Sequence, residues 1–249
     1  NAGLRMKALH LARVVLHLLQ GLATCALVFP LAGPALRERC IRSWSRKLLA
    51  ICGVQLGVSG VLSDTPALIV CNHVSWLDIF AINSLRPCRF VAKSDIRDWP
   101  LIGWLCERSG TIFIARGRQR DVRRIFQGLV NSIHAGERVA FFPEGTVSMQ
   151  GTLLPFHANL FEAAIDANVP VQPYALRYLD RNGQPHPAVE YVGDTTFVQS
   201  MLTILQHRDI RAELLLLPTL PSNGAHRREL AVAAHDVIAV ALGAEKAAA

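Results

Sequence analysis

From Thr65 onward, short runs of apolar residues alternate with segments in which apolar positions recur at helical spacing. The short runs are almost continuously apolar, which is typical of strands in a sheet that is covered on both faces. The pattern therefore predicts an α/β fold with a largely parallel sheet flanked by helices. The predicted strands are 67–71, 89–92, 111–115, 138–142, 171–177, 189–192 and 212–217, and the predicted helices are 77–85, 101–108, 121–134, 158–167, 197–207 and 227–242.

The N-terminal part shows a different pattern. Residues 14–36 form an uncharged run of 23 residues, long enough as a helix, at about 1.5 Å per residue, to cross a bilayer core of roughly 30 Å. Pro30 and Pro34 interrupt the run, and basic residues flank it on both sides, which disfavours a simple span. Residues 36–54 mix apolar and cationic side chains, as interfacial helices do. We expect a helical pair that lies in one leaflet.

The positive charge of the chain is concentrated in the same part. The net charge is +7, and residues 1–60 contain eight Lys and Arg against one Glu, whereas the rest of the chain has 18 residues of each sign. Each cation near an anionic bilayer contributes about 1 kcal/mol. We predict a membrane-associated helical segment at 1–60 and one α/β domain at 61–249. A signal peptide and a nucleic-acid patch are disfavoured, because the cations adjoin neither a small-residue cleavage site nor stacking aromatics.

Composition excludes several further classes of protein. With 51% hydrophobic residues, the chain is too apolar for disorder. Its six cysteines are widely spaced and no Cys/His pair has metal-ligand spacing, so neither a disulfide framework nor a zinc site is indicated. A reducing cytosolic setting fits this cysteine usage.

The first segment that carries chemistry is Asn-His-Val-Ser-Trp-Leu-Asp at 72–78, directly after a predicted strand. Loops at the carboxyl ends of strands are the usual place for reacting groups in open α/β sheets. Asp78 falls early in the next helix, where its carboxylate can fold back onto one ring nitrogen of His73 and leave the other to accept a proton. The pair predicts a general base, although an isolated His-x4-Asp also occurs without any catalytic role.

Two cations follow other predicted strands. Lys93 comes after the strand at 89–92, and Arg116 ends the segment Gly-Thr-Ile-Phe-Ile-Ala-Arg at 110–116. If both face one cleft, the planar fork of Arg116 and the point charge of Lys93 suit a phosphate group. Alternatively, Arg116 only opens the solvated basic run 116–124.

A third segment, Phe-Phe-Pro-Glu-Gly-Thr at 141–146, runs from a predicted strand into a turn. Glu144 is placed there to hold a hydroxyl-bearing ligand, and the N–H groups near Gly145 and Thr146 are placed to hold an anion. A proline-flanked strand at 169–176 either lines a chain-binding wall or belongs to the core.

In this order and spacing, the four segments at 72–78, 110–116, 141–146 and 169–176 resemble the lysophospholipid acyltransferase family, the PlsC-like proteins that include 1-acylglycerol-3-phosphate acyltransferase. The resemblance covers roughly residues 60–180, and Lys93, Pro100 and Gly103 match the family's Lys…Pro-x-x-Gly stretch. It implies a glycerolphosphate acyltransferase-like α/β fold behind an N-terminal membrane-binding helical pair. It also implies an acyl carrier protein or coenzyme A thioester as co-substrate, with no bound cofactor and no metal.

The resemblance assigns a role to each candidate residue. His73 would be the general base and Asp78 its orienting partner. Arg116 and Lys93 would bind the acceptor phosphate, and the turn formed by Glu144, Gly145 and Thr146 would position the acceptor. Because the lipids lie in the bilayer and the thioester arrives from the cytosol, we expect the protein at the cytoplasmic face of the inner membrane.

One position departs from the family pattern. Many members that act on phosphate acceptors carry an arginine directly after Glu-Gly-Thr, whereas this chain has Val147. A hydrogen bond to a charged group contributes about 1.5–3 kcal/mol, so phosphate recognition would be weaker here. The expected acceptor is lysophosphatidate held by Arg116 and Lys93, or another lysolipid such as a lyso-ornithine lipid or a lysophosphodiester.

The expected reaction is direct transfer, in which His73 takes the hydroxyl proton as that oxygen attacks the thioester carbonyl. No Gly-x-Ser-x-Gly segment indicates a serine nucleophile, although Ser75 keeps a covalent route open. A metal set of His73, Asp78 and Glu144 is disfavoured by the arginine-rich surroundings. A thioester hydrolase and a non-catalytic membrane adaptor are the rival functions.

Overall fold

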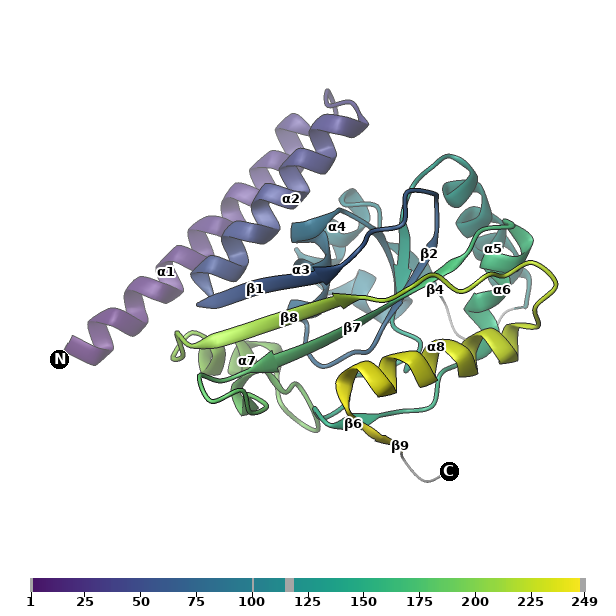
Figure 1. Cartoon of the computed structure of the whole chain (residues 1–249). Coiled ribbons are helices and arrows are strands. Elements are labelled where there is room, and N and C mark those ends of the chain that lie inside the picture. Colours follow the sequence, from purple (N-terminus) through teal and green to yellow (C-terminus); the bar gives the residue numbers. More distant parts are fainter. Residues whose placement is uncertain (1, 100, 115–118, 247–249) are drawn as a thin grey trace.

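The chain begins with two helices that form a hairpin projecting from the rest of the molecule (Figure 1). This computed structural model describes residues 2–99, 101–114 and 119–246, and within them only the backbone of 2–8, 119–125 and 245–246. The first helix, α1, is Ala2–Ala23 and continues as a π-helical stretch, Thr24–Val28. α2 is Pro34–Ile51. The break between them lies where the prolines predict it. Within the described residues, one helical stretch, Leu9–Val28, is long and apolar enough to cross a bilayer.

The two helices are joined by a ring pair. The indole of Trp44 on α2 stacks on the imidazole of His17 on α1, with ring centroids 4.4 Å apart. His17 Nε2 donates to the carbonyl of Trp44 at 2.9 Å, and Trp44 Nε1 donates to the carbonyl of His17 at 3.0 Å. A Cβ on Gly21 would come 2.7 Å from the Trp44 Nε1 atom, so this close approach of the helices depends on glycine.

A seven-stranded sheet follows, in the order β1-β8-β7-β2-β5-β3-β4. β7 and β8 pair antiparallel, whereas the other described pairs of this sheet are parallel. In chain order the elements are β1 Val54–Gly60, β2 Leu68–Cys71, α3 Leu77–Leu85, β3 Arg89–Lys93, the 3-10 turn Ser94–Asp98, α4 Ile102–Arg108, β4 Ile112–Ile114, α5 Gln119–His134, β5 Val139–Phe141, β6 Thr152–Leu153, the 3-10 turn Ala158–Phe161, α6 Glu162–Asp166, β7 Val171–Leu179, the 3-10 turn Pro187–Val189, α7 Phe197–Ile204, β8 Ile210–Leu216, α8 Arg227–Leu242 and β9 Glu245–Lys246.

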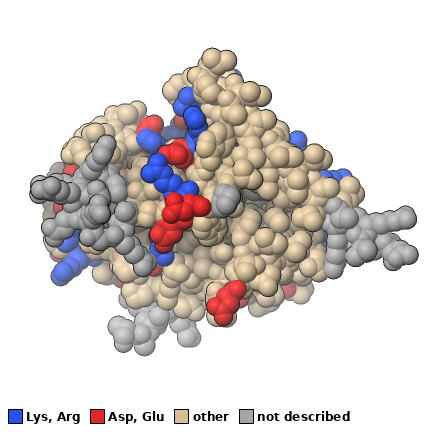
Figure 2. Space-filling view, turned by 180° about the vertical axis from the view of Figure 1, so that it is seen from behind, with Lys and Arg blue, Asp and Glu red and all other residues tan. Residues whose placement is uncertain are grey.

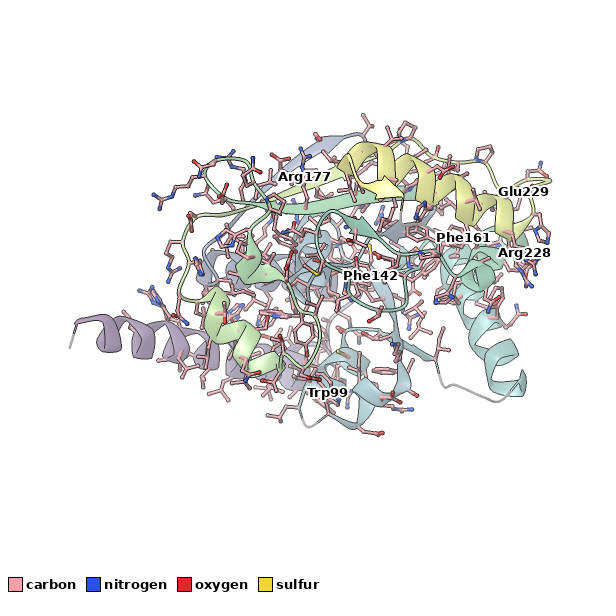
Figure 3. All side chains as sticks on the ribbon, turned by 90° about the horizontal axis from the view of Figure 1, so that it is seen from below. Trp99, Phe142, Phe161, Arg177, Arg228 and Glu229 are labelled. Atoms are coloured by element: carbon pink, nitrogen blue, oxygen red, sulfur yellow. The ribbon has the colours of Figure 1, made fainter. Side chains whose placement is uncertain are left out.

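The sheet separates two apolar clusters, which explains why its strands are continuously apolar. Ile69 and Cys71 of β2 face the cluster formed with α2, α3 and α7, whereas Leu68 and Val70 face the cluster formed with α5, α6 and α8. Seen from below, α8 lies on one side of the sheet and the hairpin with α7 on the other (Figure 3). The α/β class and the largely parallel sheet are therefore confirmed.

Two sequence predictions are wrong in part. The strand expected at 189–192 is absent from this described region, because Pro187–Val189 forms a 3-10 turn. Val189 is apolar because it is buried in the core, not because it belongs to the sheet. Val54–Gly60 is a sheet strand, parallel to β8, so the helical segment ends at Ile51 instead of reaching residue 60. The division into a membrane segment and a catalytic domain stays a prediction.

Candidate active site

The site lies where the central strand β2 ends. All four residues of β2 are buried, and the strand lies between β5 and β7. Directly after it, the amide of Asn72 makes two 2.8 Å hydrogen bonds to Leu176 of β7, accepting from its N–H and donating to its carbonyl. These bonds extend the contact between the strands by one residue and place His73 just beyond the carboxyl edge of the sheet.

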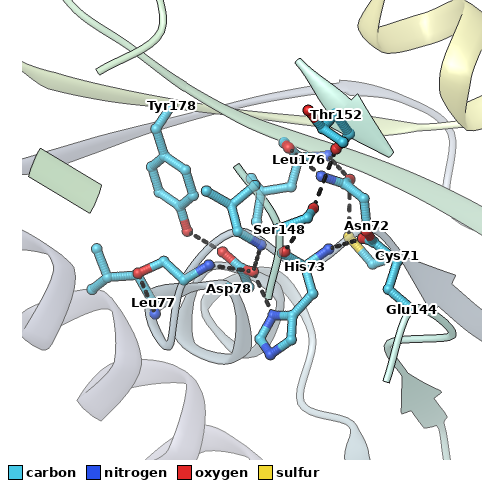
Figure 4. A network of polar contacts seen from close by, with 12 residues as sticks. Cys71, Asn72, His73, Leu77, Asp78, Glu144, Ser148, Thr152, Leu176 and Tyr178 are labelled. Atoms are coloured by element: carbon cyan, nitrogen blue, oxygen red, sulfur yellow. Dashed lines mark hydrogen bonds and ion pairs between the residues drawn. The ribbon is translucent and has the colours of Figure 1, made fainter. Parts of the chain in front are cut away.

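His73 and Asp78 meet as their spacing predicts. Asp78 lies in the first turn of α3, and its Oδ2 atom is 2.8 Å from Nδ1 of His73. The same oxygen accepts the N–H groups of Val74 at 2.7 Å and Ser75 at 3.0 Å. The other oxygen, Oδ1, accepts the hydroxyl of Tyr178 at 2.7 Å (Figure 4). The side chain of Asp78 is fully buried, whereas 18% of the His73 side chain is exposed.

The hydrogen bonds around Asp78 indicate which tautomer the neutral imidazole of His73 adopts. Asp78 accepts two backbone N–H groups and one hydroxyl, which is the environment of an ionised carboxylate. Burial, together with the neighbouring Asp78 carboxylate, raises the pKa of Tyr178 well above its usual range, so its hydroxyl stays a donor. Nδ1 of His73 therefore donates to Asp78, and the lone pair is on Nε2, which points away from the network in Figure 4.

Aromatic packing fixes the plane of the imidazole. The His73 ring stacks on Phe142 with centroids 3.9 Å apart and planes within 10°. Phe142 in turn stacks on Phe90 of β3, 5.7 Å away. Two contacts of different kinds, the hydrogen bond to Asp78 and the stack on Phe142, thus hold the ring in one orientation.

Glu144 lies behind this loop with only 3% of its surface exposed. Oε1 accepts the N–H of His73 at 2.8 Å, and Oε2 accepts the N–H of Leu154 at 3.0 Å. Burial raises the pKa of Glu144, an effect that these N–H donors partly offset. The structure therefore shows a carboxylate that holds the His73 loop, and the acceptor-positioning role expected for Glu144 stays a prediction.

The rest of this turn, residues 145–148, connects to His73 through its backbone. Gly145 and Thr146 are exposed and Val147 is half-buried. Gly145 has a φ of +69°, a conformation that favours glycine. The N–H of Ser148 donates to the carbonyl of His73 at 2.8 Å. The exposed turn expected for anion binding is thus tied directly to the His73 loop, and the N–H of Gly145 itself donates to the carbonyl of Phe142 at 3.0 Å.

Of the two cations predicted to bind phosphate, the structure describes Lys93 but not Arg116. Lys93 is exposed at the carboxyl end of β3, which lies two strands from β2, roughly 10 Å at the usual strand spacing. Arg116, the side chains of the basic run 116–124, and Pro100 lie outside the described residues. Gly103 has a packing role, because a Cβ there would overlap the backbone carbonyl of Arg97.

Three residues that support the site carry no sequence prediction. Tyr178 completes the shell of Asp78, Asn72 joins β2 to β7, and Gln150 accepts the N–H of Tyr178 at 2.7 Å. The sequence offers one signal for these residues, a polar side chain beside an apolar strand. That signal does not identify their hydrogen-bond partners, which lie 28 to 104 residues away in the chain.

One group of side chains in the described part of the chain has metal-ligand proximity. The ligand atoms of His186, His207 and Asp209 lie within 4.8 Å of one another. His186 Nδ1, however, accepts the N–H of Ala188 at 3.2 Å, so the neutral ring carries its proton on Nε2, the nitrogen 3.6 Å from Asp209. This arrangement favours a hydrogen-bonded cluster over a metal site.

Known proteins resemble this chain over much of its length. The family model described as Acyltransferase matches residues 56–177. The lyso-ornithine lipid O-acyltransferase of Pseudomonas aeruginosa is 39% identical over 83% of this chain and 80% of that protein. The 1-acyl-sn-glycerol-3-phosphate acyltransferase of Neisseria meningitidis is 40% identical over 61% of this chain and 60% of that protein.

The fold also has a solved counterpart. The crystal structure of the 1-acyl-sn-glycerophosphate acyltransferase PlsC from Thermotoga maritima superposes with a TM-score of 0.72, covering 96% of this chain and 94% of that one. At 17% identity this likeness concerns the fold alone.

Proposed function

Because the chain belongs to the acyltransferase family, we propose that it moves a fatty acyl chain from an acyl thioester to the free hydroxyl of a lysolipid. The observation that carries this proposal is the pairing of a partly exposed imidazole with a fully buried carboxylate, 2.8 Å apart. The pair supplies a base whose free nitrogen faces outward, which is what the deprotonation of a hydroxyl requires.

The reaction then follows from the geometry of His73. Nε2 accepts the proton of the acceptor hydroxyl while that oxygen attacks the thioester carbonyl carbon. The carbon–sulfur bond breaks, the new ester forms, and the imidazolium returns its proton to the departing thiolate. Asp78 stabilises the imidazolium through Nδ1–H and keeps its own charge. Positioned base catalysis of this kind contributes about 10²–10⁴ in rate.

The oxyanion donors come from outside the His73 loop. The N–H groups of Val74 and Ser75 are directed to Asp78, and that of His73 is directed to Glu144. The N–H of Gly145 donates to the carbonyl of Phe142 at 3.0 Å, so the exposed Thr146 beside it is the candidate donor, in a turn that Glu144 ties to the His73 loop.

The acceptor is a lysolipid, and two head groups are candidates. 1-Acyl-glycerol-3-phosphate, giving phosphatidic acid, fits Lys93 at the same edge of the sheet as His73. A lyso-ornithine lipid is favoured by Val147, which offers no cationic partner to a phosphate monoester. The longer match to a lyso-ornithine lipid acyltransferase points the same way.

The lipid bilayer, at the cytoplasmic face of the inner membrane, is the proposed setting. α1 and its π-helical continuation carry exposed apolar side chains along their length, among them Leu9, Leu16, Leu19 and Leu27. On the inner side of the same stretch, Val14, His17 and Cys25 are buried. The proposed acyl donor is a thioester of coenzyme A or of acyl carrier protein; the basic run 116–124 would suit the acidic carrier.

The test is a panel of purified lysolipids incubated with radiolabelled acyl thioester. The proposal expects ester formed only with a lysolipid, and His73→Ala abolishes it while circular dichroism and liposome binding persist. Free fatty acid released at equal rates with and without lysolipid would show a thioester hydrolase. A His73→Ala protein with unchanged function in the cell would show a membrane adaptor.

The same panel tests the head group. Val147→Arg should shift preference toward 1-acyl-glycerol-3-phosphate, because a guanidinium binds a phosphate monoester bidentately. The matched control is Val147→Gln, which has a long side chain without charge. Equal preference in both variants would remove Val147 from the argument.

A further inference from the structure

α7 differs from the other helices packed on the sheet because it lacks ionisable side chains altogether. From Thr195 to Gln206 the chain contains no charged residue. On its inner side, Ser200, Met201 and Ile204 are buried. On its outer side, Val198 is 56% exposed and Leu202 is 41% exposed. These two residues are one helical turn apart and therefore lie on the same face.

α7 also lies at the base of the hairpin. Arg208, just after α7, donates from Nη1 to the carbonyl of Ile51 at 3.0 Å. A Cβ on Gly53 would come 2.8 Å from the carbonyl oxygen of His207, so the two backbones are in direct contact. In Figure 3, α7 and the hairpin lie on the same side of the sheet.

The surface on this side is poor in charge. Seen from behind in Figure 2, the acidic and basic side chains gather mainly in a band along the middle of the face, and the area on the side of the N-terminal helix is largely tan. This side of the molecule therefore suits an apolar partner.

α7 contacts the catalytic loop as well. The indole of Trp76, which lies between His73 and Asp78, donates from Nε1 to Ser200 Oγ at 3.1 Å. The ring of Phe197 packs against the edge of Trp76 with centroids 5.0 Å apart. A displacement of α7 would thus be transmitted to the segment that holds the catalytic pair.

We propose that α7 is a second bilayer-contacting element, in which Val198 and Leu202 enter the lipid interface beside α1. The proposal rests on the proposed function, since it takes the bilayer as the partner of the hairpin. The bilayer is the fitting occupant because the face is uncharged and lies on the same side of the sheet as the hairpin, whose stretch Leu9–Val28 is long and apolar enough to cross a bilayer.

The test compares two double substitutions of equal chemistry. Val198→Asp with Leu202→Asp places carboxylates on the outer face of α7. The control, Val232→Asp with Val240→Asp, does the same on α8, where these valines are 60% and 84% exposed on the other side of the sheet. Flotation with vesicles containing phosphatidylglycerol measures binding. We expect the α7 variant to bind on the order of tenfold more weakly, and the control to bind like wild type.

Equal binding of the two double variants overturns the proposal. If the aspartate variant of α7 does not fold, Val198→Thr with Leu202→Gln applies the same test without charge and should still weaken flotation several-fold. Relative to wild type, the α7 variant should lose more acyl-transfer activity toward lysolipid in vesicles than toward lysolipid in detergent micelles. Absence of transfer by wild type in both settings would refute the proposed function, whereas the flotation result stands independently.

Discussion

Replacing Tyr178 with phenylalanine removes one hydroxyl from the shell of Asp78 and leaves the aromatic ring in the core. The lost hydrogen bond is 2.7 Å long, and Tyr178 and Asp78 both have 0% exposed surface. The backbone N–H of Tyr178, which donates to Gln150, is unaffected. The substitution therefore isolates a single contact to a buried carboxylate.

The magnitude follows from the chemistry of that contact. A hydrogen bond to a charged group contributes about 1.5–3 kcal/mol, and the buried Oδ1 atom has no access to water as a replacement. If this energy serves to hold Asp78 against the imidazole in the transition state, kcat falls about 10- to 150-fold. KM should change by less than about twofold, because a fully buried side chain cannot touch the acceptor.

The assay is steady-state acyl transfer to the preferred lysolipid, with melting temperatures measured alongside. Tyr174→Phe is the matched control, since Tyr174 is buried on the same strand four residues away, and it should keep kcat within about twofold. If Tyr178→Phe retains wild-type kcat, or loses activity through KM alone, the hydroxyl does not orient Asp78.

Three further substitutions test the packing around the site. Gly103→Ala should destabilise the protein by about 1–3 kcal/mol, because the new methyl overlaps the Arg97 carbonyl; Gly128→Ala, in open space on α5, should not, as thermal unfolding will show. Asn72→Asp should lower stability by about 1–3 kcal/mol, since a carboxylate oxygen would face the Leu176 carbonyl, and an unchanged melting temperature would contradict this. Burial raises the pKa of Glu144 above its ordinary value of 4.5, so the folded chain binds the carboxyl proton more tightly than the unfolded chain does. The contribution of Glu144 to the free energy of unfolding therefore falls as the pH rises above 4.5. The stability advantage of wild type over Glu144→Gln should therefore narrow between pH 4.5 and neutrality in denaturant titrations, and widening would refute this cause.

The sequence was sufficient for those elements whose pattern has a local physical cause. β2, β5 and β7 are apolar on both faces because the sheet is covered on both sides. The contact between His73 and Asp78 was predictable because a loop followed by the first turn of a helix brings residues at that spacing together. Both predictions depend only on the types and spacing of residues that are close together in the sequence.

What escaped prediction depends on distant contacts. The sequence of β1 gives only a weak strand signal, because most of its residues are exposed and carry no continuous apolar run. Its pairing partner, β8, is more than 150 residues away in the chain. Val189 was predicted to lie in a strand because a buried turn residue and a buried strand residue are both apolar, and the sequence alone does not distinguish them. Tyr178 reaches Asp78 across 100 residues of chain, a distance at which periodicity carries no information.

The turn at the foot of the hairpin has a mechanical consequence. Only Cys52 and Gly53 separate the end of α2 from the edge strand of the sheet, and the His207 backbone closes over that junction. A connection this short leaves little room for the hairpin to move independently of the sheet. If the hairpin binds the bilayer as proposed, it also fixes the height of His73 relative to the lipid head groups, and the acceptor hydroxyl must reach that level.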